Sequence, residues 1–533
     1  MLTTLPEQMS DLTPVTRKQN SFASTAAFWA CLLALSAAGV GLLLYSTPLG
    51  VGLSWDSFTY ITSARGLLEG LGLARLTGCG ELKPMTGYPP LYPLVLAGFE
   101  WVGLKAVRAA RVISALSLGA TVILTGILAR RMTRSSLAAL LAGLIALSSS
   151  TLLAVYSWAW TEPLFVVLCL GCFLFLSYYL QSQRAWALLG ASACLCLAML
   201  LRYAGLALLA TTVVALVIDL CRTRAHGAQS KWKYMAAGLA LGASPLAVWM
   251  ARNFSLRGNF VNRHLEWHPL GSENLSQLAR TVAAWILPGS INPLGQPITR
   301  QAIDASLAKW VLPLFGVALL LSAVRMARKC RSASRMNLES LLLAWIIVYL
   351  GFVAVSLVLL DPNIPLDDRI LSPVYVPALL LVTAGAVGLW CRKRAVVRGV
   401  VIAGVLSLIS LHGLQLASSV RVLRSDGQGY AATQWRSSRV LETLREQNPA
   451  RVYTNEIPGV YFTAGLAACS IPVKGDDQGL EEMRTVLRSP GSVLVLFGRV
   501  SPEYVPEDAL TKDLRETLSF PWDGRVFVYS GGP

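Results

Sequence analysis

The chain has 533 residues, of which 54% are hydrophobic and only 14% are charged. A soluble protein carries about a quarter of its residues as Asp, Glu, Lys and Arg, so this composition excludes an ordinary soluble enzyme. The net charge of +17 would suit a nucleic-acid partner, but 16 of the 46 Lys and Arg residues lie in four short clusters between apolar blocks, which instead favours a membrane protein.

Residues 1–24 are polar and are predicted to form a cytoplasmic tail. The apolar block at 25–46 is too long for the hydrophobic part of a signal peptide, so we interpret it as an uncleaved first span. Further blocks have the length needed to cross a hydrocarbon core about 30 Å thick. We expect a polytopic α-helical membrane protein of about eleven transmembrane helices, at 25–46, 108–130, 135–155, 161–181, 186–202, 203–221, 234–250, 306–325, 339–360, 370–391 and 398–418.

Basic clusters between these blocks predict the orientation in a plasma or inner membrane. If the N-terminus is cytoplasmic, every cluster lies on the cytoplasmic side, as the positive-inside rule requires. The long loops 47–107 and 251–305 and the C-terminal part then lie on the extracytoplasmic side. The transmembrane domain is predicted over 25–418, and the clusters lie at 130–134, 222–233, 325–335 and 392–398.

The C-terminal part, 419–533, has a different pattern. The runs "RVYTNE", "SVLVLFGRV" and "RVFVYSG" are rich in Val, Tyr and Phe and are typical of strands. Between them, "AATQWRSSRVLETLREQ" and "GLEEMRTVLRS" have helical periodicity. The alternation predicts a small extracytoplasmic α/β domain.

The ten cysteines show no metal-binding spacing. Four of them lie inside apolar blocks and are interpreted as small buried hydrophobic residues: Cys169, Cys172, Cys194 and Cys196. Only Cys79 and Cys469 fall in predicted extracytoplasmic segments. A disulfide between them is one alternative, and the sequence leaves it open because it does not show proximity.

Polar residues at the ends of spans are candidates for function, because ionisable groups are costly in lipid. With the topology above, six such features share the extracytoplasmic face. They are Asp56, "TGYPPLYP" (86–93), "SWAWTEPLF" (157–165), "LRYAG" (201–205), "WMARN" (249–253) and "PLDDRILSPVYVP" (365–377).

These features, in this order, are similar to those of the GT-C membrane glycosyltransferases. In the first extracytoplasmic loop, the shared features are an acidic residue and a "PPLYP" turn into the next apolar block. In the later spans, they are "TEPLF" at the start of one span, an Arg-Asn pair at the end of another, and an Arg followed by spaced prolines. Over about residues 25–420 the pattern resembles the protein O-mannosyltransferases and the lipid A aminoarabinose transferases. The resemblance implies an inverting transfer from a polyprenyl-phosphate-linked sugar, in contact with membrane lipid, to an acceptor on the extracytoplasmic face.

The chemistry of the residues agrees with that implication. A lipid phosphate is a good leaving group once its charge is held, so one carboxylate suffices to take the proton from an attacking hydroxyl. Asp56 fits this catalytic role. Guanidinium groups match phosphate oxygens, so Arg369, Arg252 and Arg202 are the candidates for binding the donor phosphate.

Each of these residues also has a simpler interpretation. Asp56 could be the N-cap of the helix that follows it. Arg369 could pair with Asp367 or Asp368 instead, and Arg252 and Arg202 could be anchors at helix ends.

The remaining candidates are expected to line or orient the pocket. Glu162 either orients an arginine or the acceptor, or simply occupies the first turn of a helix. The tyrosines in this set could equally be interfacial residues. The set comprises Glu162, Tyr60, Tyr88, Tyr92, Asp368 and His264.

A divalent metal is left open, and the sequence establishes no other cofactor. His264 and His268 flank Glu266 in "NRHLEWH", and His and carboxylate groups are suitable ligands. A third spaced ligand is missing from this segment, so a wet interfacial loop is the alternative.

Two departures from the related families leave the sugar and the acceptor open. Tyr88 stands where the aminoarabinose transferases have a Lys, and Ser57 stands where the mannosyltransferases have a second acidic residue. The loop 251–305 could close over the donor, and the C-terminal domain could hold the acceptor or brace that loop. The rival functions are a transporter or flippase of lipid-linked or anionic substrates, and a non-catalytic assembly protein.

Overall fold

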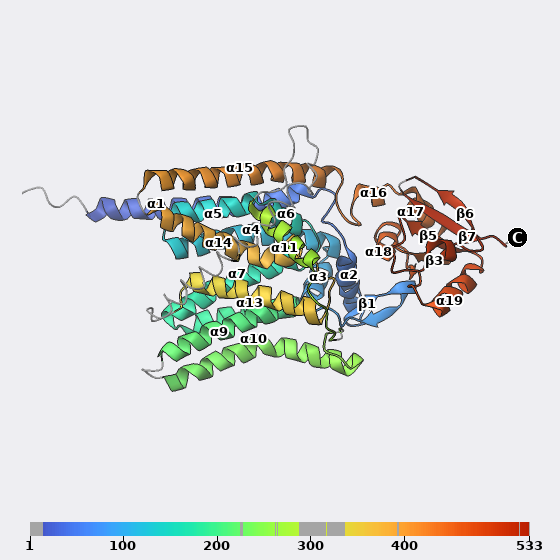
Figure 1. Ribbon diagram of the computed structural model, residues 1–533, viewed down its shortest axis with the longest axis horizontal. Helices are drawn as coiled ribbons and strands as arrows, with labels where there is room; N and C mark the ends of the chain where they lie inside the picture. The colour runs from blue at the N-terminus through green and yellow to red at the C-terminus, as the bar shows by residue number, and fades with distance from the viewer. Residues whose placement is uncertain are drawn as a thin grey trace, which may run out of the picture.

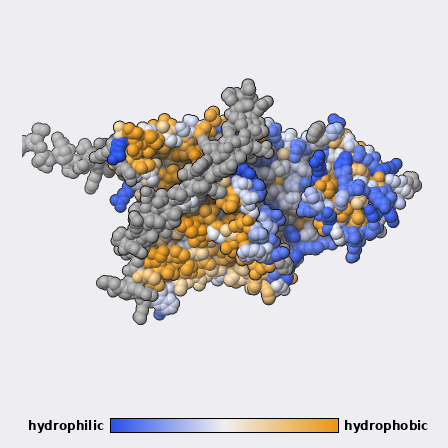
Figure 2. Space-filling view, viewed as in Figure 1, coloured by the Kyte–Doolittle hydropathy of each residue, from blue (hydrophilic) through white to orange (hydrophobic). Residues whose placement is uncertain are grey.

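The computed structural model describes residues 14–223, 228–261, 263, 265–286, 316, 336–391, 394–521 and 523–531. A bundle of long helices forms one end of the molecule and a small α/β region forms the other, with helix α2 (Trp55–Leu68) between them (Figure 1). Figure 2 shows hydrophobic residues over the helices on this face and mostly hydrophilic residues over the C-terminal region. The polarity therefore changes along the long axis of the molecule, as expected for a membrane domain joined to an aqueous one.

Seven helices in the described residues are long and apolar enough to cross a membrane. An eighth span results if α5 (Ser136–Ser148) and α6 (Ser150–Tyr156), which meet at a 54° bend, are counted together. The seven are α1 (Pro14–Ser46), α4 (Ala106–Thr133), α7 (Glu162–Ser182), α10 (Ala228–Arg257), α13 (Leu338–Leu359), α14 (Asp368–Trp390) and α15 (Ala395–Ser425).

The expectation of about eleven spans is therefore met only in part. Two of the predicted spans, 186–202 and 203–221, are the helices α8 (Ala185–Leu201) and α9 (Gly205–Thr223), which are shorter than the seven. The predicted span at 306–325 lies outside the described residues, apart from the single residue 316.

The predicted first loop is folded against the end of the bundle. It contains α2, a hairpin of β1 (Ala74–Leu76) and β2 (Leu82–Pro84) with the turn η1 (Gly78–Gly80), and α3 (Leu91–Trp101). In the second long loop, α10 continues to Arg257, and α11 (Ser272–Ile286) forms where the sequence "LSQLARTVAAWIL" predicts a helix.

The C-terminal region is a five-stranded mixed sheet with the strand order β4-β3-β5-β7-β6. β3 pairs in parallel with β4 and β5, whereas β7 pairs antiparallel with β5 and β6. The strands are β3 (Arg451–Thr454), β4 (Cys469–Ser470), β5 (Ser492–Phe497), β6 (Leu514–Ser519) and β7 (Gly524–Tyr529). The helical segments are α16 (Thr433–Arg436), α17 (Arg439–Gln447), α18 (Ile457–Gly459), η2 (Val460–Ala464), α19 (Asp477–Leu487) and α20 (Glu507–Leu510).

The expected α/β character of this region is confirmed, with differences in detail. β3, β5 and β7 lie in the three predicted strand runs, and α19 lies on the second predicted helix. The first predicted helix is divided into α16 and α17, because the Ser438 side chain accepts a hydrogen bond from the Leu441 N–H and begins a new helix there. The short β4 and the polar edge strand β6 lack a pattern that predicts them.

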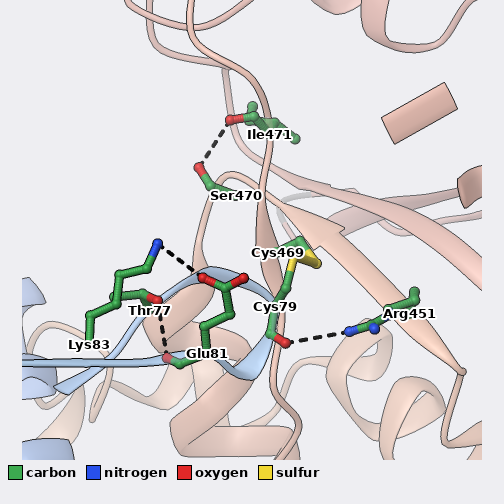
Figure 3. Close-up of a disulfide and its surroundings, with 8 residues drawn as sticks. All are labelled: Thr77, Cys79, Glu81, Lys83, Arg451, Cys469, Ser470 and Ile471. Atoms are coloured by element: carbon green, nitrogen blue, oxygen red, sulfur yellow. Dashed lines mark hydrogen bonds and ion pairs between the residues drawn. A yellow bond between two sulfur atoms is a disulfide. The ribbon is translucent and has the colours of Figure 1, made fainter. Parts of the chain in front are cut away.

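The disulfide between Cys79 and Cys469 that the sequence left open is present (Figure 3). It joins the turn η1 to strand β4, across 390 residues of sequence, with a Cα–Cα distance of 4.1 Å. The first loop and the C-terminal region are therefore covalently linked.

Candidate functional site

Asp56 lies in the first turn of α2, but it does not cap that helix. The N-cap is Ser54, whose side chain and that of Ser57 form a reciprocal capping box with each other's backbone N–H groups. Ser54 also accepts a hydrogen bond from the Trp160 indole at 2.9 Å, and Ser57 donates to the Ala159 carbonyl at 3.0 Å. The start of α2 is thus held against the segment before α7, and the Asp56 carboxylate is free to make other contacts.

That carboxylate belongs to a continuous network of ion pairs. Arg369 pairs with Asp56 through Nη2 and with Glu162 through Nε, the latter at 2.6 Å. Arg202 pairs with the same oxygen of Glu162 and donates a hydrogen bond to the Thr161 hydroxyl at 2.8 Å. Two arginines and two carboxylates therefore alternate, and their formal charges balance.

The local structure of α14 explains how Arg369 is presented in its first turn. Pro373 and Pro377 lack N–H groups, which leaves the carbonyls of Arg369 and Pro373 without their usual helical donors. The Ser372 hydroxyl donates to the Arg369 carbonyl at 2.9 Å, and the Trp345 indole donates to the Pro373 carbonyl at 2.8 Å. The helix thus tolerates both prolines just beyond the arginine.

Arg202 reaches the same network from the turn between α8 and α9. α8 ends at Leu201, Arg202 is extended, and Gly205 begins the next helix. A Cβ on Gly205 would lie 2.6 Å from the Met199 Cα, so the tight turn requires glycine. This turn directs the arginine side chain toward the start of α7.

Three tyrosines lie on the α2 and α3 side of the network. The Tyr88 hydroxyl donates to Oδ1 of Asp56 at 2.5 Å. The Tyr60 ring packs edge-on against both Tyr88 and Tyr92, with ring centroids 5.2 Å apart in each pair. Burial, together with the charge of Asp56, raises the pKa of the Tyr88 hydroxyl. This hydroxyl therefore stays protonated and acts as a donor to the carboxylate.

Trp160 and Thr161 belong to the network although they were not among the candidate residues. The Arg369 guanidinium lies 4.3 Å from the centroid of the Trp160 ring, which itself stacks on Trp158. Both residues lie in the feature "SWAWTEPLF". Their role depends on a stacked arginine and a hydroxyl contact, which spacing in the sequence does not reveal.

Two further candidates, Arg252 and Asp368, have other partners. Arg252 donates to the Met85 carbonyl at 3.0 Å and lies 4.4 Å from the Trp249 ring centroid. Asp368 accepts a hydrogen bond from the Trp285 indole at 3.2 Å, which attaches the end of α11 to the start of α14. His264 lies outside the described residues.

Among the described residues, no group of three or more His, Cys, Asp or Glu side chains could hold a metal ion. Glu266 and His268, from the segment considered above, use their backbone N–H groups to bond the carbonyls of Leu359 and Val358 at the end of α13. The described part of this segment thus packs on the bundle.

The family model that matches the chain is described as dolichyl-phosphate-mannose-protein mannosyltransferase, and it covers residues 76–256. This range includes Glu162, Arg202 and Arg252. Comparison with curated protein sequences gives no significant match.

Solved structures of membrane glycosyltransferases share the fold. ArnT from Cupriavidus metallidurans bound to undecaprenyl phosphate has a TM-score of 0.58 and 14% identity, with 95% of this chain and 99% of that chain covered. Its apo state gives a TM-score of 0.59, at 14% identity, with 96% and 100% covered.

A third similar structure is the oligosaccharyltransferase AglB from Archaeoglobus fulgidus, in complex with an inhibitory peptide and a dolichol-phosphate. Its TM-score is 0.52 at 12% identity, with 89% of this chain and 70% of that chain covered. At such identities the structural likeness establishes the fold alone, and the family model matches only residues 76–256. The chain therefore shares its fold with ArnT and with the oligosaccharyltransferase AglB, and its residues 76–256 are similar to the dolichyl-phosphate-mannose-protein mannosyltransferase family.

Proposed function

We propose that the chain transfers a sugar from a polyprenyl-phosphate donor to an acceptor nucleophile, with inversion at the anomeric carbon. The observation that carries this proposal is the direct pairing of Arg369, at the start of a membrane helix, with the carboxylate of Asp56. A phosphate-binding group and a proton acceptor thus share one site. ArnT bound to undecaprenyl phosphate and AglB bound to dolichol-phosphate, which share the fold, support the choice of donor.

The reaction is a single displacement. Asp56 takes the proton from the acceptor hydroxyl as the acceptor oxygen forms its bond to the anomeric carbon. The bond from that carbon to the phosphate oxygen breaks, and its electron pair leaves with the polyprenyl phosphate. Attack from the face opposite the leaving group inverts the configuration.

The arginines stabilise the leaving phosphate. Arg369 and Arg202 lie near the starts of α14 and α7 in the described structure, where helix N-termini also favour an anion. Glu162, buried between them, holds both guanidinium groups in place. Arg252 remains a third candidate, although its Nη1 group already holds the Met85 carbonyl.

The resting pairing predicts an order of binding. Arg369 is shared between Asp56 and Glu162, so an incoming phosphate competes with Asp56 for the Nη2 group of the arginine. Once the phosphate occupies that group, the Asp56 carboxylate is released to accept a proton. Donor binding would thus activate the base before the acceptor arrives.

The orientation is also part of the proposal. The basic clusters favour a cytoplasmic N-terminus, with the loop 47–107 outside. The bond between Cys79 and Cys469 supports the same arrangement, since disulfides persist in oxidising compartments and are rare in the cytosol. The network that contains Asp56 would then lie on the extracytoplasmic side of the membrane.

The test is transfer by the purified chain in lipid nanodiscs, with a panel of labelled polyprenyl-phosphate sugars and with peptide, lipid and saccharide acceptors. A transferase gives a glycosylated product and free polyprenyl phosphate in equal amounts. A flippase would move the labelled lipid between leaflets without releasing phosphate, and an assembly protein would do neither.

Asp56→Asn should abolish both products. The matched control is Asp361→Asn, since Asp361 also pairs with an arginine, Arg263, but lies outside the network. Full transfer by Asp56→Asn would remove Asp56 from the catalytic role.

A further inference from the structure

Helix α2 has two functional sides. One side presents Asp56 to the ion-pair network and packs Tyr60 among the tyrosines. The other side packs against the C-terminal region, which lies beyond α2 from the bundle (Figure 1). The position of the Asp56 carboxylate therefore depends on both halves of the molecule.

Phe58, two residues after Asp56, is the main apolar contact. Its side chain is 3% exposed and belongs to the apolar core of the C-terminal region, together with Val440, Ile457 and Val460. Its ring meets that of Tyr461 edge-on, with centroids 5.2 Å apart. An aromatic residue of α2 thus fills part of the core of the C-terminal region.

Arg65 makes the second contact, two helical turns beyond Phe58. Residues seven positions apart lie on the same face of a helix. Its Nη1 group donates to the Tyr461 hydroxyl at 2.6 Å, and its guanidinium lies 5.6 Å from the centroid of the same ring. Tyr461 therefore holds α2 at two points, through its ring and through its hydroxyl.

The disulfide fixes the segment that follows α2 (Figure 3). The Cys79 N–H donates to the Ala468 carbonyl at 2.9 Å, and Arg451 donates to the Cys79 carbonyl at 3.4 Å. The hairpin that carries Cys79 is joined to α2 through a hydrogen bond of 3.3 Å from the Leu76 N–H to the Thr62 hydroxyl.

The segment that precedes α2 is held as well. The Tyr430 N–H donates to the Leu53 carbonyl at 2.9 Å, directly before the cap residue Ser54. Gly429 has φ +56°, and a Cβ there would lie 2.2 Å from the Leu53 carbonyl oxygen. This close approach requires glycine at position 429. The segment that enters the C-terminal region therefore packs directly against the segment that enters α2.

We propose that the C-terminal region is the positioning element of the catalytic carboxylate, acting on transfer through Phe58, Tyr461 and the disulfide between Cys79 and Cys469. The inference rests on the proposed function of Asp56 as the base. Transfer then requires the oxidised chain, because reduction frees the hairpin that is bonded to α2 and so loosens the helix that carries Asp56.

The experiment compares Phe58→Ala with Met483→Ala in the full chain. Met483 is fully buried in the apolar cluster that contains Leu494 and Leu496 of β5. The cluster around Phe58 contains Val493 and Val495, so the two clusters lie on opposite faces of the sheet. Both variants remove a buried side chain from an apolar cluster of the C-terminal region, but only Phe58 belongs to α2.

We expect Phe58→Ala to lower kcat at least tenfold with less than a twofold change in KM for the donor. Met483→Ala should lower the thermal midpoint and leave kcat within twofold of the wild type. Tyr461→Phe, which keeps the ring contact with Phe58 and loses the bond to Arg65, should lower kcat severalfold without loss of fold. Equal losses of kcat in Phe58→Ala and Met483→Ala would reduce Phe58 to a structural residue and overturn the inference.

The disulfide gives a second arm. Dithiothreitol should lower the kcat of the wild type to that of the double variant Cys79→Ala, Cys469→Ala, which should itself be insensitive to the reductant. Unchanged turnover of the reduced wild type would overturn the inference.

Hydrogen exchange of the α2 amides separates this inference from the proposed function, since it requires no transfer. Exchange should rise in Phe58→Ala and in the reduced wild type, and stay unchanged in Met483→Ala. A wild type that transfers no sugar but shows this exchange pattern would refute the proposed function and leave the positioning role supported. Unchanged exchange in Phe58→Ala would refute the positioning role alone.

Discussion

The exchange of Glu162 for Gln tests whether the ion-pair network is a structural element as well as a chemical one. Glu162 is 1% exposed, and its carboxylate accepts from both Arg202 and Arg369. Glutamine keeps the volume and one acceptor oxygen, but it places an amide N–H group among guanidinium donors. Arg202 would then lose its carboxylate partner, and Arg369 would keep only that of Asp56.

The magnitude follows from the burial of the partners. Removing one partner of a buried ion pair costs about 3–5 kcal/mol. Arg202 and Arg369 keep 16% and 22% of their side-chain surface exposed, so water still solvates their charges in part. We therefore expect Glu162→Gln to lower the free energy of unfolding by about 3 kcal/mol. With an unfolding entropy of about 2 cal/mol/K per residue over the chain, that loss lowers the thermal midpoint by about 3 °C.

The assay is the apparent midpoint of thermal unfolding of the purified full chain in detergent, followed by circular dichroism at one scan rate. Glu273→Gln is the matched control, since Glu273 is 82% exposed and pairs with the exposed Arg280. Such a surface pair contributes less than about 1 kcal/mol, so the control should shift the midpoint by less than 1 °C. Equal midpoints for Glu162→Gln and the wild type would refute the claim that this network stabilises the fold.

Three further predictions concern the same region. Arg369→Ala should weaken donor binding, measured as a rise of at least tenfold in KM for the labelled donor. Arg369→Lys should restore only part of the donor affinity, because lysine lacks the fork of hydrogen-bond donors of arginine. Tyr88→Phe removes a hydrogen bond to the charged Asp56, worth about 1.5–3 kcal/mol, so kcat should fall at least tenfold and the thermal midpoint should fall by about 1–3 °C. An unchanged kcat would show that the hydroxyl does not orient the carboxylate. Trp345→Phe leaves the Pro373 carbonyl without its hydrogen-bond donor and should destabilise the chain by about 1–3 kcal/mol. The same unfolding assay measures this loss, and an unchanged midpoint would show that water replaces the indole as the donor.

The sequence by itself determined the class of protein and the positions of most helices. Hydrophobic length and charge clusters are local properties, and each membrane helix satisfies its backbone hydrogen bonds within its own segment. The alternation of strand and helix patterns likewise indicated the C-terminal α/β region. The predicted bounds of α8 and α9, 186–202 and 203–221, lie within two residues of the observed ones.

Tertiary structure alone decided which polar groups meet. Arg369 reaches Asp56 across 313 residues and Glu162 across 207, and no periodicity in the sequence encodes such contacts. The cap of α2 depends on a competition that the sequence leaves open: Ser54 forms the capping box, so Asp56 is available to the network. In the sequence Phe58 is an apolar residue shortly after Asp56, and only packing places it in the core of a region that begins more than 350 residues later. Local patterns thus specify the elements, while the site depends on contacts that form only when distant elements pack together.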